Sequence, residues 1–230
     1  MGAPIELLRK VPLLSQLSQG ELTAIASLAQ RKRYLPRDVI VQQSDPSSEL
    51  FIIVEGHLKV VTAGADGRDS ALGIMGPGEV IGEVSLLDGG PRSATIATID
   101  HCELLLIRRE PFLKFLETSP KTAIELIRVL AGRLRRLTER SEDIAFLRVG
   151  GRLAKRLVGL ARQYGEKLPD GGMRIGFKLS QQEIGELVGA TRESANKQIK
   201  AWEQEGLLSQ QSGHIVIHDL DRLGQQSGDE

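Results

Sequence analysis

The chain has 230 residues, 30 basic and 30 acidic side chains, and only 3% aromatic residues. This length favours two domains over one, and the low aromatic content argues against a protein that stacks single-stranded nucleic acid on exposed rings. The single cysteine, Cys102, excludes a disulfide framework, a four-cysteine zinc site and a cysteine-ligated iron–sulfur cluster within one chain.

The first 110 residues change from a helical to a strand-like pattern. Ser18 before Leu22 and Ile25 is typical of a capped helix, so we expect short helices within residues 5–30. Short β-type runs then alternate with Gly, Pro and Asp turn signals up to about residue 110. The runs are Val39–Val41, Leu50–Val54, His57–Val61, Thr95–Ile99 and Glu103–Ile107. Several short strands at this spacing predict a small antiparallel barrel or jelly roll.

A long amphipathic pattern begins at Pro120. Apolar residues recur every three to four positions over roughly 25 residues, which corresponds to a helix about 37 Å long. They are Ile124, Ile127, Leu130, Ala131, Leu134, Leu137 and Ile144. The stripe is narrow and close to a 3.5-residue repeat, as in a helix that pairs with an identical copy. We therefore expect a homodimer; packing of this helix on its own barrel is the alternative.

Residues 178–202 have the pattern of two helices joined by a glycine turn. Ser180, with Glu183 three positions later, is a capping box that begins the first helix, and Gly189 ends it. Thr191 caps a second helix with an apolar inward face. That face consists of Ala195, Ile199 and Trp202. This arrangement predicts a helix-turn-helix.

The outward face of the second helix is polar. Arg or Lys matches guanine and Glu accepts from cytosine in the major groove, so this face suits DNA, although an ordinary solvated helix is the alternative. Its residues are Arg192, Glu193, Asn196, Lys197 and Lys200. We expect DNA contacts from Ser180, Gln181, Thr191, Arg192, Glu193, Ser194 and Lys197. A hairpin over residues 207–217 predicts a wing that touches phosphates.

Charge is unevenly distributed along the chain. Residues 148–200 hold eleven Lys or Arg and five Asp or Glu, so this segment has a net charge of +6 in a chain whose total is zero. A local basic surface suits a polyanion. At its start, Gly150-Gly151 predicts a hinge, because glycine tolerates unusual backbone angles.

Residues 76–99 form a second candidate site. Gly82-Glu83 is followed, nine residues after Glu83, by Arg92-Ser93-Ala94. Small residues that expose backbone N–H groups, together with one Arg and one Ser, suit a phosphate. A carboxylate on the same loop suits ribose hydroxyl groups. The pattern therefore indicates a nucleotide site.

Together, the barrel, the loop, the long helix and the helix-turn-helix resemble the catabolite activator (cyclic AMP receptor)/fumarate-nitrate regulator family over about residues 5–220. The resemblance implies an α+β fold with an N-terminal cyclic-nucleotide-binding β-roll or jelly roll (1–118), a long dimerisation helix and hinge (119–147) and a C-terminal winged helix-turn-helix (148–230). It implies a homodimer that senses cyclic AMP, binds palindromic DNA and contacts RNA polymerase. With no run of about 18 apolar residues, we expect no membrane span and a cytoplasmic location.

The resemblance also implies roles for the loop residues. Glu83 would hold the ribose 2′-hydroxyl, and Arg92 and Ser93 would hold the cyclic phosphate. The Gly82 backbone would line the sugar, with Ala94 in the same ligand loop. These five residues make up the expected phosphate and sugar site.

On the long helix, Thr138 would reach the adenine across the dimer, with Arg133 one turn before it. The family's activators usually carry two adjacent hydroxyl residues where this chain has Leu137-Thr138. One lost polar contact corresponds to roughly 1 kcal/mol of binding free energy. Residues 145–147 match the hinge, and Lys197 stands where activators usually have Arg, which weakens bidentate guanine recognition.

Other readings remain open. The effector could be cyclic GMP or cyclic di-GMP instead of cyclic AMP, or the regulator could act without any ligand. An enzyme is disfavoured, because the four histidines show no metal-type spacing and no nucleophile motif such as G-x-S-x-G occurs. We expect no metal, iron–sulfur cluster or haem, and we interpret Cys102 as a core residue.

Overall fold

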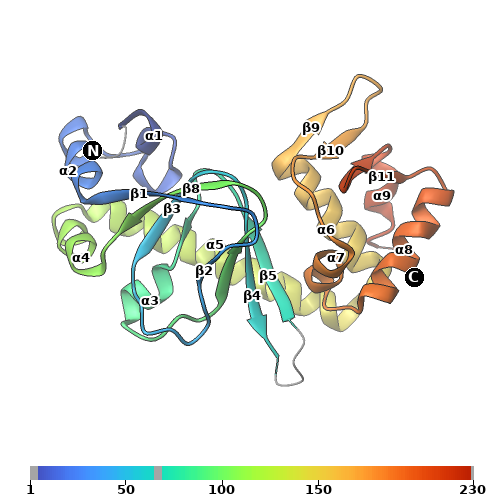
Figure 1. Cartoon of the computed structure of the whole chain (residues 1–230), viewed down its shortest axis with the longest axis horizontal. Helices are drawn as coiled ribbons and strands as arrows, with labels where there is room; N and C mark the ends of the chain where they lie inside the picture. The colour runs from blue at the N-terminus through green and yellow to red at the C-terminus, as the bar shows by residue number, and fades with distance from the viewer. Residues whose placement is uncertain (1–4, 65–68, 229–230) are drawn as a thin grey trace. The chain divides into compact units, whose positions relative to one another are not determined.

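The computed structural model describes residues 5–64 and 69–228 of the chain (Figure 1). The described residues divide into two compact units: 5–63 with 74–136, and 64 and 69–73 with 137–228. Strand β5 and helix α5 each contribute residues to both units. Each unit is described by itself.

The first unit begins with short helices and continues as a β-roll. The helices are α1 (Ile5–Arg9), the 3-10 helix η1 (Pro12–Leu14) and α2 (Gln19–Leu28). The strands are β1 (Ala29–Tyr34), β2 (Val39–Val41), β3 (Leu50–Glu55), β4 (Leu58–Ala63), β5 (Asp69–Met75), β6 (Val80–Ile81), β7 (Thr95–Thr98) and β8 (Cys102–Ile107). Helices α3 (Glu83–Asp88), α4 (Arg109–Thr118) and α5 (Pro120–Phe146) complete the series.

The strands form two four-stranded sheets, in the orders β1-β8-β3-β6 and β2-β7-β4-β5. Strand β3 pairs with β8 in antiparallel register, Leu50 opposite Ile107 and Phe51 opposite Leu106. Both faces of β3 are covered: Leu50 and Ile52 pack toward the helices, whereas Phe51 and Ile53 pack inside the roll. Double burial explains why this strand is a continuous apolar run rather than an alternating one.

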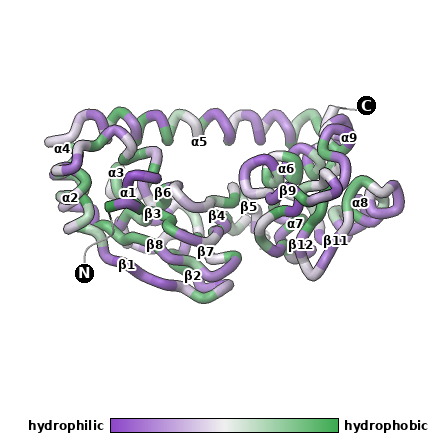
Figure 2. The backbone as a smooth tube through the Cα atoms, turned by 90° about the horizontal axis from the view of Figure 1, so that it is seen from above, coloured by the Kyte–Doolittle hydropathy of each residue, from purple (hydrophilic) through white to green (hydrophobic). Residues whose placement is uncertain are grey.

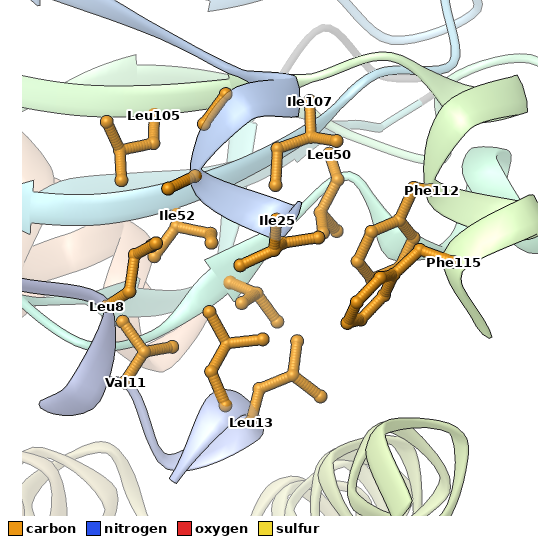
Figure 3. Close-up of a cluster of buried hydrophobic side chains, with 14 of the residues drawn as sticks. Leu8, Val11, Leu13, Ile25, Leu50, Ile52, Leu105, Ile107, Phe112 and Phe115 are labelled. Carbon is orange, nitrogen blue, oxygen red and sulfur yellow. The ribbon is translucent and has the colours of Figure 1, made fainter. Parts of the chain in front are cut away.

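Apolar side chains from the helices and from the first sheet form one cluster. Figure 3 shows Leu8, Val11, Leu13 and Ile25 facing Leu50, Ile52, Leu105 and Ile107, with Phe112 and Phe115 of α4 beside them. The two phenyl rings stack with centroids 6.4 Å apart. This cluster fixes β3 and β8, the strands next to the ligand loop, against the helical layer.

Helix α5 spans 27 residues, and within them only Thr122 and Leu126 are buried. Hydrophobic and hydrophilic segments alternate along its length in Figure 2. The predicted long helix after Pro120 is confirmed.

The second unit contains the end of α5 and a small helix–sheet assembly. Its elements are α6 (Val149–Tyr164), β9 (Gly165–Lys167), β10 (Met173–Ile175), α7 (Gln181–Val188), α8 (Arg192–Gln204), β11 (Leu208–Gln211), β12 (His214–Ile217) and α9 (Leu220–Gln225). The strands form one sheet in the order β11-β12-β10-β9. Hairpin β11–β12 is the predicted wing, and the predicted fold class is confirmed. The three predicted domain ranges stay a prediction.

The hinge predicted at Gly150-Gly151 assumed unusual glycine backbone angles, and that assumption is wrong. Gly150 and Gly151 lie in the first turn of α6 with ordinary backbone angles, and the break from α5 falls at Leu147 and Arg148. A Cβ atom on Gly150 would lie 3.0 Å from the Gln198 Oε1 atom. Gly150 therefore packs near the end of the Gln198 side chain, and the backbone of neither glycine bends the chain.

Candidate functional site

The loop between β6 and α3 brings Gly82 against Arg92. Gly82 has a φ of +82°, and a Cβ atom there would lie 2.5 Å from Arg92 Nη1 and 2.6 Å from the Glu49 carbonyl oxygen. Both the backbone angle and the space exclude any other residue without rearrangement. The contact between these two loop segments is thus built into the backbone.

Arg92 is 3% exposed and is held by acceptors from two segments, the loop before β3 and the loop after β6. Its Nε donates to the Ser47 hydroxyl at 2.9 Å, and Nη1 donates to the carbonyls of Glu49 at 2.9 Å and Gly82 at 3.3 Å. Nη2 donates to the Glu49 carboxylate at 3.1 Å, and the guanidinium lies 5.7 Å from the centre of the Phe51 ring. Burial lowers the pKa of Arg92, and the charge and hydrogen bond of Glu49 oppose that shift.

Glu83, in the first turn of α3, is also 3% exposed. It forms an ion pair with Arg133 of α5, which also donates to the carbonyl of Val80. The Nε atom of Arg133 is buried and has no hydrogen-bond partner among the described residues. The cluster therefore contains two carboxylate–guanidinium ion pairs, Glu49 with Arg92 and Glu83 with Arg133.

The other predicted ligand residues are not held in the same way. Ala94 is buried beside the loop, whereas Ser93 is exposed next to Arg92. Thr138 is exposed on the part of α5 that belongs to the second unit. Ser47 and Glu49 were not predicted: they lie 45 and 43 positions from Arg92, in a polar loop whose only sequence signal is its place before a buried strand.

In the second unit, the helix-turn-helix has the predicted local structure. The Ser180 hydroxyl accepts from the Glu183 backbone N–H, and Glu183 accepts from the Ser180 backbone N–H, which completes the capping box. Gly189 follows α7 with a φ of +62°, and the Thr191 hydroxyl caps α8. These capping contacts make α7 and α8 short helices with fixed ends.

The two faces of α8 differ as predicted. Ala195, Ile199 and Trp202 are fully buried. The exposed residues at its start and along the opposite face are Thr191, Arg192, Glu193, Ser194, Lys197 and Lys200. The face can thus present donors and one carboxylate to the edges of base pairs.

Two predicted DNA-contact residues already have structural partners. The Ser180 hydroxyl belongs to the capping box, and Gln181 Nε2 donates to Gln210 Oε1 at 2.6 Å. The Gln210 backbone N–H in turn donates to the Glu203 carboxylate at 3.2 Å. This chain of hydrogen bonds fixes α7, α8 and the wing relative to one another.

Arg152 connects the helix-turn-helix to the end of α5. From α6, its Nε donates to the Val188 carbonyl at the end of α7, and its Nη1 donates to the Leu147 carbonyl, both at 2.9 Å. Lys155 lies 2.5 Å from the carboxylate of Asp143 on α5. A displacement of the last turn of α5 would therefore act directly on α6 and α7.

The chain matches the family model of a cyclic nucleotide-binding domain over residues 31–119 and that of a Crp-like helix-turn-helix domain over residues 151–226. It is 31% identical over 222 residues to the CRP-like cAMP-activated global transcriptional regulator of Mycobacterium tuberculosis (strain ATCC 25618 / H37Rv), covering 96% of this chain and 99% of the relative. The chain belongs to the CRP/FNR family.

Two further CRP/FNR comparisons agree with this assignment. The cAMP-activated global transcriptional regulator CRP of Escherichia coli O157:H7 is 30% identical over 187 residues, covering 81% of this chain and 88% of the relative. The structure of the c-di-GMP responsive global regulator CLP of Xanthomonas campestris has a TM-score of 0.76 at 27% identity, covering 88% of this chain and 100% of that chain. This CRP/FNR protein is therefore a ligand-gated DNA-binding transcription regulator with a cyclic nucleotide effector, and the prediction of a regulator rather than an enzyme is confirmed.

A separate cavity of about 360 Å³ contains none of the predicted ligand residues. Its lining is Arg33, Tyr34, Leu35, Asp38, Glu55, His101, Cys102 and Glu103. Burial raises the pKa of the Cys102 thiol to about 12, so this thiol stays protonated at neutral pH and is a poor metal ligand.

Over residues 5–64 and 69–228, no group of three or more His, Cys, Asp or Glu side chains is placed to hold a metal ion. The same residues include no helix with the length and apolarity to cross a bilayer.

Proposed function

We propose that this CRP/FNR regulator is a homodimer that binds a palindromic DNA site when cyclic AMP occupies the β-roll. The observation that carries the proposal is the buried cluster of Arg92 and Glu83 within the segment that matches a cyclic nucleotide-binding domain. Relatives at 30% and 31% identity are named as cAMP-activated, which supports cyclic AMP over other effectors.

In the proposed ligand site, each polar group has one task. Arg92 and Ser93 hold the cyclic phosphate, because a guanidinium in a dry site binds an anion strongly. Glu83 accepts from the ribose 2′-hydroxyl, while the backbone of Gly82 and the small side chain of Ala94 leave room for the sugar. Arg133 orients Glu83 through their ion pair, and Thr138 would reach the base across the dimer.

The dimer is supported by the exposed apolar stripe of α5. Leu134 is 67% exposed and Ile127 is 63% exposed in the single chain. The exposed stripe consists of Ile124, Ile127, Leu134, Leu137 and Ile144. A second copy of the same helix matches its spacing and would remove it from water.

DNA recognition is proposed for α8 and the residues that flank it. In a two-fold dimer, the two α8 helices would enter successive major grooves roughly 34 Å apart. The proposed contact residues are Ser180, Gln181, Thr191, Arg192, Glu193, Ser194 and Lys197. Contact with RNA polymerase and a cytoplasmic location stay predictions.

A second candidate effector is cyclic di-GMP. It is favoured by the similarity to the structure of CLP, a c-di-GMP responsive regulator, and by Leu137, a non-polar residue on the face proposed to meet the base. A cyclic dinucleotide would still present a phosphodiester to Arg92.

A DNA titration tests the proposed function. We expect cyclic AMP to raise the affinity for a palindromic site about 5- to 150-fold at ~0.15 M salt, which corresponds to a coupling free energy of about 1–3 kcal/mol. Cyclic GMP and cyclic di-GMP are added in parallel. A response to cyclic di-GMP alone supports the second candidate, and equal affinity in every titration contradicts gating by these nucleotides.

A further inference from the structure

The guanidinium of Arg92 has almost no free hydrogen-bonding capacity. An arginine side chain carries five N–H bonds, and four of those in Arg92 already point at acceptors of the protein. Three of the acceptors are neutral, the Ser47 hydroxyl and the carbonyls of Glu49 and Gly82. The fourth is the Glu49 carboxylate, which therefore stands where a bound anion would stand.

The two ion pairs of the cluster balance in charge without a ligand, and Asp45 is a further acid whose charge acts on Arg92. Glu49 neutralises Arg92, and Glu83 neutralises Arg133. A nucleotide phosphodiester carries one negative charge, so its arrival would place two anions on Arg92 and leave the cluster with one uncompensated negative charge. Like charges a few ångströms apart repel strongly in a partly buried site.

We infer that Glu49 is an internal competitor of the ligand: its carboxylate occupies the phosphate position on Arg92 in the empty protein and must leave when the phosphodiester binds. This inference rests on the proposed function, because it takes Arg92 as the phosphate-binding residue. Glu49 then sets the ligand concentration at which the regulator responds.

The environment of Glu49 permits this exchange. Its side chain is 36% exposed, whereas that of Arg92 is 2% exposed, so the carboxylate can turn into water while the guanidinium stays in place. The neutral acceptors keep the guanidinium oriented after the carboxylate leaves. Glu83 cannot act as such a competitor, because its side chain is 4% exposed and is paired with Arg133.

Glu49→Gln tests the inference, because glutamine keeps the size and one acceptor oxygen but removes the charge. We expect Glu49→Gln to bind cyclic AMP about tenfold more tightly than the wild type by isothermal titration calorimetry. Glu55→Gln is the matched control: it removes a carboxylate of the same unit that is exposed at the end of β3, and its affinity should equal that of the wild type. In Arg92→Leu the added Glu49→Gln change should give no gain, since the gain acts through Arg92.

Unchanged or weaker cyclic AMP binding by Glu49→Gln overturns the inference, because it would make Glu49 a support for Arg92 rather than a competitor. A second probe separates this failure from a failure of the proposed function. If neither protein binds cyclic AMP, cyclic GMP or cyclic di-GMP, inorganic phosphate is titrated while the melting temperature is followed. Stabilisation of Glu49→Gln but not of the wild type supports the competitor, and equal responses overturn it.

Discussion

Arg92 and Lys197 are both cations that we assign to phosphate or nucleic acid, yet the protein surrounds them in opposite ways. Arg92 is buried, and acceptors from two segments fix its orientation before any ligand arrives. Lys197 is exposed on the outward face of α8, opposite a fully buried apolar face. A small anion in a dry pocket needs a preformed site, whereas a long polyanion is attracted by charges that remain in water.

The comparison predicts different responses to salt. Screening is strong between exposed charges and weak between buried ones. Binding of DNA by α8 should therefore weaken steeply as salt concentration rises, while cyclic nucleotide binding at Arg92 should change little. The substitutions Arg92→Leu and Lys197→Ala, described below, test the two sides of this difference.

The largest effect is expected from Arg92→Leu. Removing the only cation that we assign to the phosphate should weaken cyclic AMP binding about 30- to 5000-fold, since loss of one partner of a buried charge pair costs roughly 2–5 kcal/mol. Calorimetry measures the affinity, and sedimentation should show an unchanged dimer. Affinity within a few-fold of the wild type would mean that the phosphate binds elsewhere.

Leu134→Glu tests the dimer that brings two α8 helices to one DNA site. A charge in the centre of the apolar stripe should raise the dimer dissociation constant by roughly 100-fold, about 3 kcal/mol, because it would be buried without a partner. Analytical ultracentrifugation measures the constant. Arg136→Glu, exposed on the same helix but outside the stripe, is the control; equal behaviour of both variants would place the dimer interface elsewhere.

Lys197→Ala tests whether the exposed cation reads sequence or only charge. We expect specific DNA affinity to fall by about 1–3 kcal/mol and one base-pair preference to relax. Binding to a panel of single-base-pair variants of the site measures both. Lys114→Ala, which removes an exposed cation of the first unit, is the control. A uniform loss across the panel, with a smaller salt dependence, would make Lys197 a phosphate contact.

The local features of both regions could be predicted from the sequence. The capping box of Ser180 and Glu183 and the left-handed Gly189 depend on neighbours within a few positions, so their residue types reveal them. Doubly buried strands are visible as continuous apolar runs, as in β3. The family resemblance assigned Gly82 and Arg92 to one ligand loop, whereas their direct contact was not predicted.

The long-range partners could not be predicted. Glu49 reaches Arg92 from a polar loop, and nothing in its spacing distinguishes it from a solvated surface acid. Gly150 and Gly151 show a different difficulty, because glycine can mark a hinge or occupy an ordinary helical position, as these two do at the start of α6. The type of a residue alone does not indicate which residue, distant in sequence, will contact it in the folded chain.

The smallest effect is expected at Glu103, a buried carboxylate with a purely structural pairing. Burial raises the pKa of Glu103, but the hydrogen bonds and charges of Arg31 and Arg33 outweigh it, so the pKa lies below its usual value. A lowered folded-state pKa stabilises the fold above the unfolded value of about 4.3, and this contribution disappears as the pH falls through the folded value. Since Arg31 and Arg33 are largely exposed, we expect Glu103→Gln to lower the unfolding free energy by about 1 kcal/mol at neutral pH.

The same variant should differ less from the wild type as the pH falls through the folded-state pKa of Glu103, because the side chain is then protonated in both states. Chemical denaturation at a series of pH values measures the difference between the two proteins, which cancels the carboxyl groups they share, such as Glu21 and Asp100. A difference that stays constant from pH 7 to about pH 3 would show that packing, rather than charge, holds Glu103. Cyclic AMP affinity at neutral pH should be unchanged, because Glu103 pairs only with residues of β1 and lies outside the proposed phosphate site.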